Sequence, residues 1–220
     1  TYEYRNTDGE LLGYVVRVLD EKGKKQTLPV SYCHNTKANI DRWWLKGFSD
    51  KGYKPMYGAE KLGQSPLQRV LIVEGEKAAD AAAQLFPKAI VTTWPSGCKA
   101  IAKADWSPLL NRRVILWPDN DAPGKQAMDA LAQRLFGLPV ERVQIVAPPA
   151  DAPDGWDLAD ATWSPQEAAA YIKANVSSPL EPDEIDDADT PLLDPQPETP
   201  KLPFRCLGFD RGTYFYLPNG

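Results

Sequence analysis

Acidic residues directly follow two apolar stretches of this sequence. In "VLIVEGEKAAD" (residues 70–80) the apolar run ends at Glu74, and about forty residues later, in "VILWPDNDAPG" (residues 114–124), a second run ends at Asp119 and Asp121. Carboxylates that lie close together repel one another, which raises their pKa values unless a cation neutralises them. Mg²⁺ prefers such oxygen ligands and also binds substrate phosphates. If the two stretches are neighbouring strands, the three acids predict a divalent-metal site.

Glycines and lysines near these acids extend the predicted site. Gly75, Gly97 and Gly124 would allow the backbone to approach a ligand closely. Lys77 and Lys125 stand at the starts of two expected helices and could contact phosphates, although exposed lysines in a first helical turn are usually only solvated.

Each acidic motif also has a simpler interpretation. Asp and Asn favour turns and helix N-termini, so either motif alone is more often turn or cap chemistry than a site. Two such motifs after strands of one α/β unit favour a shared site. Asn120, between the two aspartates, is expected to be only a spacer.

Other residues that could do chemistry are assigned to the scaffold. Cys33 and His34 adjoin, but no second ligand pair follows at zinc-site spacing, so no structural zinc is expected and His34 is interpreted as a loop residue. Trp94 and Trp117 lie on predicted strands and are expected to belong to the core rather than to stack on bases.

The elements that must position the acids alternate between strands and helices. Continuous apolar runs predict four strands within residues 70–73, 89–97, 112–118 and 142–149, and helices follow the first and third of them. A last helix is predicted to begin at the Ser164–Pro165 pair. Such alternation predicts an α/β fold with a four-stranded parallel sheet flanked by helices. Ligands of these sheets bind outside the carboxyl ends of the strands.

The regions on either side differ in composition. Residues 1–65 predict a small β-rich subdomain with an excess of Lys and Arg, in which an Asp8–Gly9 turn joins two strands; residues 40–48 are either a short helix or an edge strand. Residues 177–203 are acidic and proline-rich, which predicts a flexible linker. Residues 204–220 predict a hairpin that starts a further, truncated domain.

Composition restricts the location of the chain. None of its apolar runs approaches the roughly 20 residues that cross a membrane. Cys33, Cys98 and Cys206 are scattered, which favours a reducing compartment and therefore the cytoplasm. The net charge of -5 hides a basic front part and an acidic end, so it does not exclude a polyanionic ligand.

The Glu-Gly pair and the later Asp-x-Asp, each after a strand, resemble the Toprim domain of DNA primases, primase-helicases, topoisomerases and some nucleases. The resemblance covers residues 66–176 and is closest to the primase branch of phages, plasmids and mobile elements. "KPMYGAEKL" (residues 54–62) and "PDGWDLADA" (residues 153–161) are similar to segments of primases that flank the same core.

The resemblance implies roles for individual residues. Glu74, Asp119 and Asp121 would be the catalytic acids that bind Mg²⁺ or Mn²⁺, and Asp157 would be a further metal-binding acid. Arg17 and Lys54 loosely match basic residues that bind template and nucleotide phosphates.

The sequence also departs from the primase pattern at two places. Ala78 stands where primases tend to have an aspartate, with Asp80 two positions further, and Asp160 is displaced by one position from the second acid of the late motif. The roles of Asp80 and Asp160 in metal binding are therefore left open.

The function implied is a DNA primase-type nucleotidyltransferase that uses nucleoside triphosphates to synthesise primers on single-stranded DNA during replication of a mobile element, phage or plasmid. A helicase or ATPase module is expected in the same full-length chain. Two alternatives stay open: a Toprim metal-dependent nuclease, and a non-catalytic Toprim module that binds DNA or a helicase. A topoisomerase is disfavoured because no tyrosine is marked as a nucleophile, and a glycosyltransferase would leave Glu74–Gly75 unexplained.

Overall fold

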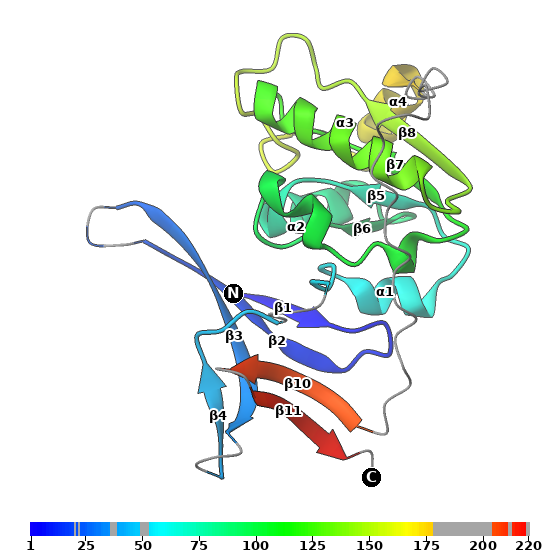
Figure 1. Cartoon of the computed structure of the whole chain (residues 1–220). Coiled ribbons are helices and arrows are strands. Elements are labelled where there is room, and N and C mark those ends of the chain that lie inside the picture. The colour runs from blue at the N-terminus through cyan, green and yellow to red at the C-terminus, as the bar shows by residue number, and fades with distance from the viewer. Residues whose placement is uncertain are drawn as a thin grey trace, which may run out of the picture.

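The first structural layer is an antiparallel sheet built from the N-terminal residues (Figure 1). The computed structural model describes residues 1–19, 21, 23–35, 39–48, 53–177, 204–210 and 213–218. The strands β1 (Tyr2–Arg5), β2 (Leu11–Leu19), β3 (Lys25–Asn35) and β4 (Ile40–Trp44) pair in that order. The predicted β-rich front part is therefore present, and residues 40–44 form a strand rather than a helix.

Local chemistry explains the first hairpin. Between β1 and β2, Asn6 Oδ1 accepts hydrogen bonds from the backbone N–H groups of Asp8 and Glu10, and Gly9 has a φ of 86°. That backbone conformation favours glycine, as the predicted Asp-Gly turn requires. The interpretation of His34 as a loop residue was wrong: it lies on β3, opposite Asp41 of β4, and its Nδ1 is 2.7 Å from Asp41 Oδ1.

The second layer is a mostly parallel sheet in the order β6-β5-β7-β8-β9. Its strands are β5 (Val70–Ile72), β6 (Ile90–Thr92), β7 (Arg113–Leu116), β8 (Arg142–Val146) and β9 (Val176–Ser177). The first three pairings are parallel, whereas β9 runs antiparallel to β8. The prediction of four strands missed β9, because β9 continues directly from the last helix without a break. In the structure β9 pairs with the edge of β8, and its Val176 is half-buried there.

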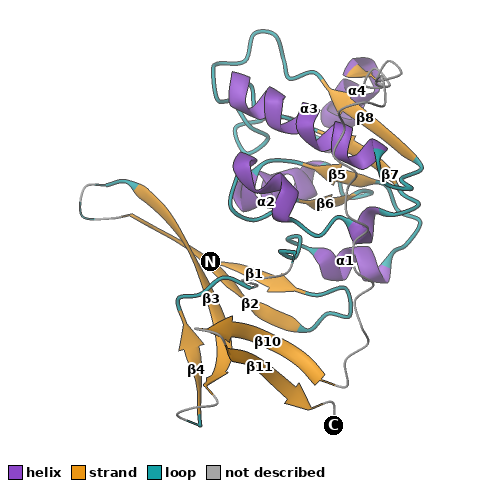
Figure 2. Cartoon of the chain, in the orientation of Figure 1, coloured by secondary structure: helices purple, strands orange, loops and turns teal. Residues whose placement is uncertain are grey.

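Helices cover both faces of this sheet (Figure 2). Alternate residues of β5 point to opposite faces. Val70 and Ile72 pack in one core cluster with α1 (Ala59–Gln64) and α3 (Ala122–Phe136), and Leu71 packs in the other with α2 (Gly75–Leu85) and α4 (Pro165–Asn175). The short helix α1 and two 3₁₀ turns, Cys98–Lys103 and Ser107–Leu109, were not predicted. Trp94 and Trp117 are buried, as expected for core residues.

Two tyrosines fasten α2 to the N-terminal part of the chain. Tyr4 of β1 is fully buried and donates a 2.8 Å hydrogen bond from its hydroxyl to Glu76 Oε1, while the Tyr57 hydroxyl donates a 2.7 Å bond to Asp80 Oδ1. Burial and then the neighbouring Glu76 raise the pKa of Tyr4 far above its usual range, so it stays a donor. The antiparallel sheet is thereby held against the helix that begins after Glu74.

The last described segments form an antiparallel strand pair. Strands β10 (Phe204–Asp210) and β11 (Thr213–Pro218) pair with each other, and both lie near β3 (Figure 1). The predicted linker lies outside the described residues except for Ser177. No helix within the described ranges combines the length and apolar character needed to cross a membrane.

Candidate active site

The candidate site lies at the carboxyl edge of the parallel sheet. Strand β5 pairs with β7 in a register that places Ile72 opposite Leu116, so Glu74 and Asp119 leave neighbouring strands at the same edge. This confirms the adjacency on which convergence of the acids depended. Strand ends of this kind are the usual ligand-binding positions of an open α/β sheet.

Gly124 is the point around which the acids pack. A Cβ placed on it would lie 2.8 Å from Glu74 Oε1, 3.0 Å from Asp121 Oδ1 and 2.8 Å from the backbone oxygen of Asp119. Glu74 Oε1 and Asp121 Oδ1 both lie within 3.0 Å of this Cβ position, so the distance between the two oxygens is at most twice that value. Only a residue without a side chain fits this position without displacing an oxygen.

Both acidic motifs are also helix N-caps. Asp121 caps α3, and its Oδ1 accepts a 2.6 Å hydrogen bond from the Gly124 N–H. Glu74 is the N-cap residue of α2, and the N–H of the following Gly75, whose φ is 75°, donates to Thr93 Oγ1. The interpretation of Asp121 as a helix cap is thus correct, and the cap does not prevent its carboxylate from also lying next to Glu74. Two helix N-termini point at the acids, and their dipoles favour negative charge there.

Burial and crowding change the acid–base behaviour of Asp119. Burial, followed by the charges of Glu74, Asp157, Asp121 and Asp160, raises the pKa of Asp119 from 3.8 to about 7. A carboxyl group in such surroundings holds a proton near neutral pH or exchanges it for another cation. The donor set, hard carboxylate oxygens with excess negative charge, suits Mg²⁺ or Mn²⁺.

In the absence of divalent metal, the free energy of unfolding is expected to fall as pH rises from about 4 to 7. The folded chain retains a proton on Asp119 that the unfolded chain has lost, so ionisation in that window costs stability. After allowance for solvent screening, the loss is on the order of 1 kcal/mol. Urea denaturation in EDTA across this pH range measures it, and added Mg²⁺ should reduce it. An unchanged profile in Asp119→Asn would show that another group is responsible.

A cleft of about 510 Å³ opens beside these acids. We call it the acidic cleft. The residues predicted for the site that line it are Arg17, Glu74, Gly75, Lys77, Gly97, Asp119 and Asp157. Residues from β2, from two strand ends and from the segment after β8 therefore meet in one cavity large enough for part of a nucleotide.

The other predicted site residues occupy different positions. Lys54 is not in the cleft wall, but its Nζ donates a 2.7 Å hydrogen bond to Oγ of Ser96, which lines the cleft. Burial, and then the nearby Lys103, lower the pKa of Lys54. Asp121 and Gly124 pack behind Glu74, and Lys125 is exposed on α3 outside the wall.

Lys77, which lines the acidic cleft, forms ion pairs with two aspartates of the late acidic motif. Lys77 Nζ lies 3.8 Å from Asp157 Oδ2 and 3.6 Å from Asp160 Oδ1. Asp160 therefore belongs to the same cluster as Asp157, whereas Asp80 is bonded to Tyr57 and does not line the cleft. Among the described residues, no three carboxylate, thiolate or imidazole groups are arranged as ligands of a single ion.

Asn120 has more than the expected role of a spacer. Its side-chain Nδ2 donates to the backbone oxygens of Ala152, at 2.8 Å, and Pro153, at 3.2 Å. Its backbone N–H donates to Trp156 O, and its own carbonyl accepts from Gly155 N–H. Nothing in the sequence near Asn120 signals these bonds, because every partner lies more than thirty residues later.

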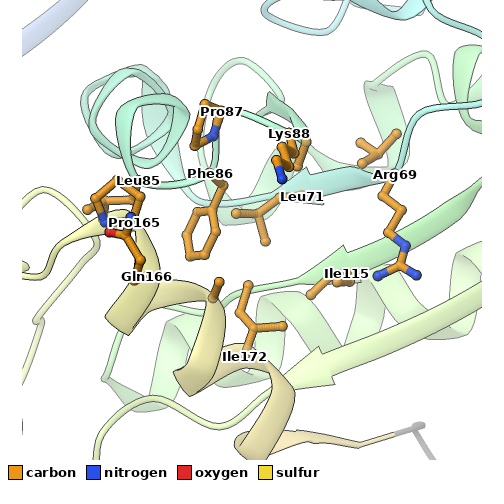
Figure 3. Close-up of a pocket in the computed structure, with 13 residues that line it drawn as sticks. Arg69, Leu71, Leu85, Phe86, Pro87, Lys88, Ile115, Pro165, Gln166 and Ile172 are labelled. Carbon is orange, nitrogen blue, oxygen red and sulfur yellow. The ribbon is translucent and has the colours of Figure 1, made fainter.

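A second concavity, of about 450 Å³, lies away from the acids (Figure 3). It is an apolar groove between the end of α2 and α4, with Leu71, Phe86 and Ile172 pointing into it and Arg69 and Lys88 at its rim. None of the described residues that line it carries a carboxylate. The acidic cleft, which gathers charged groups and glycines, is therefore the better candidate for chemistry.

Comparisons with known proteins give a fold. No protein-family model and no curated protein matches the sequence. Among solved structures, the chain is similar to the Aquifex aeolicus primase (zinc-binding and RNA polymerase domains), at 16% identity and a TM-score of 0.50, covering 79% of this chain and 39% of that one. It is equally similar to a DnaG catalytic core, at 17% identity and a TM-score of 0.50, covering 79% and 51%. The chain has the fold of DNA primase catalytic domains.

The primase fragment of the bacteriophage T7 primase-helicase also matches, at 18% identity and a TM-score of 0.46, covering 78% of this chain and 59% of that one. The chain thus spans about half of the primase structures that it resembles.

Proposed function

We propose that this chain is the metal-dependent nucleotidyltransferase core of a DNA primase, with a Toprim arrangement of acids. The observation that carries the proposal is the packing of Glu74 and the Asp119–Asp121 motif around Gly124, at the carboxyl edge of two adjacent strands. The fold of the chain, which is similar to that of a DnaG catalytic core, supports the proposal.

The acids would hold the metal, and the rest of the cleft would hold the substrates. These side chains are not arranged around a single ion in the structure, so Glu74, Asp119 and Asp121 would turn toward Mg²⁺ or Mn²⁺ as it binds, with Asp157 as a further ligand. The ion would supply charge stabilisation as pyrophosphate leaves the incoming nucleoside triphosphate. Because the pKa of Asp119 is raised to about 7, a cation would have to displace its proton, and metal binding near neutral pH would release that proton. Gly75 and Gly97 keep side chains out of the part of the cleft where phosphates would lie.

Basic side chains around the cleft would bind the nucleic-acid backbone. Arg17 reaches the cleft wall from β2, and Lys54 lies behind Ser96. Contacts of this kind carry no sequence preference and weaken as salt rises. Lys77 is oriented toward Asp157 and Asp160, so it would contact a phosphate only by exchanging these partners. Lys125, exposed on α3, would contact the nucleotide or template outside the wall.

The wider context is also part of the proposal. The substrates would be nucleoside triphosphates and single-stranded DNA, and the setting would be cytoplasmic replication of a phage, plasmid or mobile element. The full-length chain would carry a helicase or ATPase module. The substrates, the replication setting and the helicase module rest on the resemblance of the two acidic motifs to those of primases, and the cytoplasmic location rests on the scattered cysteines, which favour a reducing compartment.

The test is a synthesis assay with the chain as it stands. We expect incubation with single-stranded DNA, ribonucleoside or deoxyribonucleoside triphosphates, and Mg²⁺ or Mn²⁺ to yield short oligonucleotides, and omission of metal or template to abolish them. A parallel incubation without nucleotides separates the alternatives. Degradation of the DNA without synthesis would support the nuclease, and binding of DNA without either reaction would support the non-catalytic module.

A further inference from the structure

We infer that Asn120 is a positioning residue that sets the separation between the Asp119–Asp121 motif and Asp157. The inference rests on the proposed function, because it concerns acids that act together only if they share a cation. The side-chain amide of Asn120 donates to two carbonyl oxygens of the segment that leads into the late motif.

The hydrogen bonds of Asn120 join two segments that are far apart in sequence. Residues 119–121 follow β7, and residues 152–156 follow β8. The two backbone bonds with Trp156 and Gly155, at 2.9 and 3.1 Å, align the segments, and the side-chain amide adds bonds to two further carbonyls. Asp157 directly follows Trp156, so the position of its carboxylate depends on where this segment is held.

The segment that Asn120 holds is itself anchored in the core. The Trp156 ring lies 5.6 Å from the Trp163 ring and 6.4 Å from the ring of buried Trp117, measured between centroids. Such a cluster gives the segment a fixed support. Asn120 therefore connects residues 119–121 to a segment that the tryptophan cluster holds in place. Precise placement of a ligand group requires such rigid support.

The amide is specifically suited to this position. The Nδ2 group of asparagine has two N–H donors, one for each of the Ala152 and Pro153 carbonyl oxygens, and the Pro153 oxygen also accepts from the Trp156 N–H. An aspartate of the same shape would present an oxygen to those carbonyls and would repel them. It would also add a negative charge beside the acids, which on charge alone would strengthen cation binding. Positioning and simple charge thus make opposite predictions for Asn120→Asp.

The experiment measures Mn²⁺ affinity by electron paramagnetic resonance of the free ion, which does not depend on primer synthesis. We expect Asn120→Asp and Asn120→Ala each to raise the Kd for Mn²⁺ about tenfold, the usual effect of removing an outer support of a metal ligand. Gln126→Glu, which adds a charge on exposed α3 surface and keeps Asn120, should leave the Kd unchanged or lower it.

A stability-matched control separates positioning from general loosening of the fold. Ser164→Ala removes the capping box of α4, which costs about 1 kcal/mol. It should leave the Kd for Mn²⁺ unchanged. Equal or tighter Mn²⁺ binding by Asn120→Asp, wild-type affinity in Asn120→Ala, or an equal loss in Ser164→Ala would overturn the role. Failure of the unmodified chain to bind Mn²⁺ would overturn the proposed function as well.

Discussion

Replacement of both Asp119 and Asp121 by Asn is expected to lower metal-dependent primer synthesis by at least ~100-fold while the chain stays folded. The loss follows from the chemistry of the site. The substitution removes two of the charges that would hold the cation, and a neutral amide oxygen is a much weaker ligand for Mg²⁺ than a carboxylate. Initial rates of oligonucleotide synthesis under saturating template and nucleotide measure the effect.

The same structure explains why this double variant should fold. Asn is as good an N-cap as Asp, so the bond from Gly124 N–H to residue 121 can be kept. At position 119, Asn removes a charge that burial and the neighbouring acids disfavour, so without metal the melting temperature above pH 7 should equal or exceed that of the wild type. Stability gained with activity lost is typical of residues that serve a site rather than the fold.

Asp129→Asn is the matched control. Asp129 lies exposed on α3, so its substitution removes a carboxylate from the same helix without touching the acids. We expect wild-type synthesis from it. Undiminished synthesis by the Asp119/Asp121 variant would contradict the proposed catalytic role of both residues, and an equal loss in the control would indicate a nonspecific effect of charge.

The strands and the acids could be predicted from the sequence because their signals are local. The runs around residues 70–73 and 114–117 are apolar throughout, and each ends in residues that favour turns. The prediction of a shared metal site depended on these two strands being neighbours, which the sequence alone does not show. The pairing of Ile72 with Leu116 in the structure satisfies that condition.

The features that the sequence did not reveal depend on contacts between distant segments. The role of Asn120 requires Ala152 and Pro153, whose carbonyls are brought to it by the packing of β8 against β7. Strand β9 has only two residues, too few for a periodic signal, and exists because the edge of β8 is free to pair. Helix α1 begins at Ala59, after an N-cap residue, Gly58, that is in the left-handed region and has no side chain to mark the start of the helix.

In the absence of a cation, the burial and crowding of these acids disfavour the charged form of Asp119 and so lower the free energy of unfolding above its usual pKa. Burial and then the charges of four other carboxylates, Glu74, Asp157, Asp121 and Asp160, raise the pKa of Asp119. Lys77 is the ion-pair partner of Asp157 and Asp160. A scaffold with no ligand to bind has no reason to retain such repulsion. The electrostatics therefore support the proposed cation site, which either a nucleotidyltransferase or a metal-dependent nuclease would use.

Gly124→Ala is expected to reduce both stability and Mn²⁺ affinity, in contrast to the Asp119/Asp121 variant. Within a helix Ala is normally favoured over Gly by about 1 kcal/mol. Here its Cβ would lie 2.8 Å from the Asp119 carbonyl oxygen and within 3.0 Å of the carboxylates of Glu74 and Asp121. Side chains could turn away, but the backbone oxygen cannot do so cheaply, so we expect a net loss of about 1–3 kcal/mol.

The new Cβ would also push the carboxylates of Glu74 and Asp121 away from residue 124, and this displacement should raise the Kd for Mn²⁺ at least tenfold. Urea denaturation and Mn²⁺ titration measure the two effects. Gly47→Ala is the control, because a Cβ there meets no atom of the described residues within 4 Å, and it should change stability by less than about 0.5 kcal/mol. Wild-type stability and affinity in Gly124→Ala would mean that the acids do not need to pack around this glycine. A loss of stability alone would mean that Gly124 serves the fold but not the site.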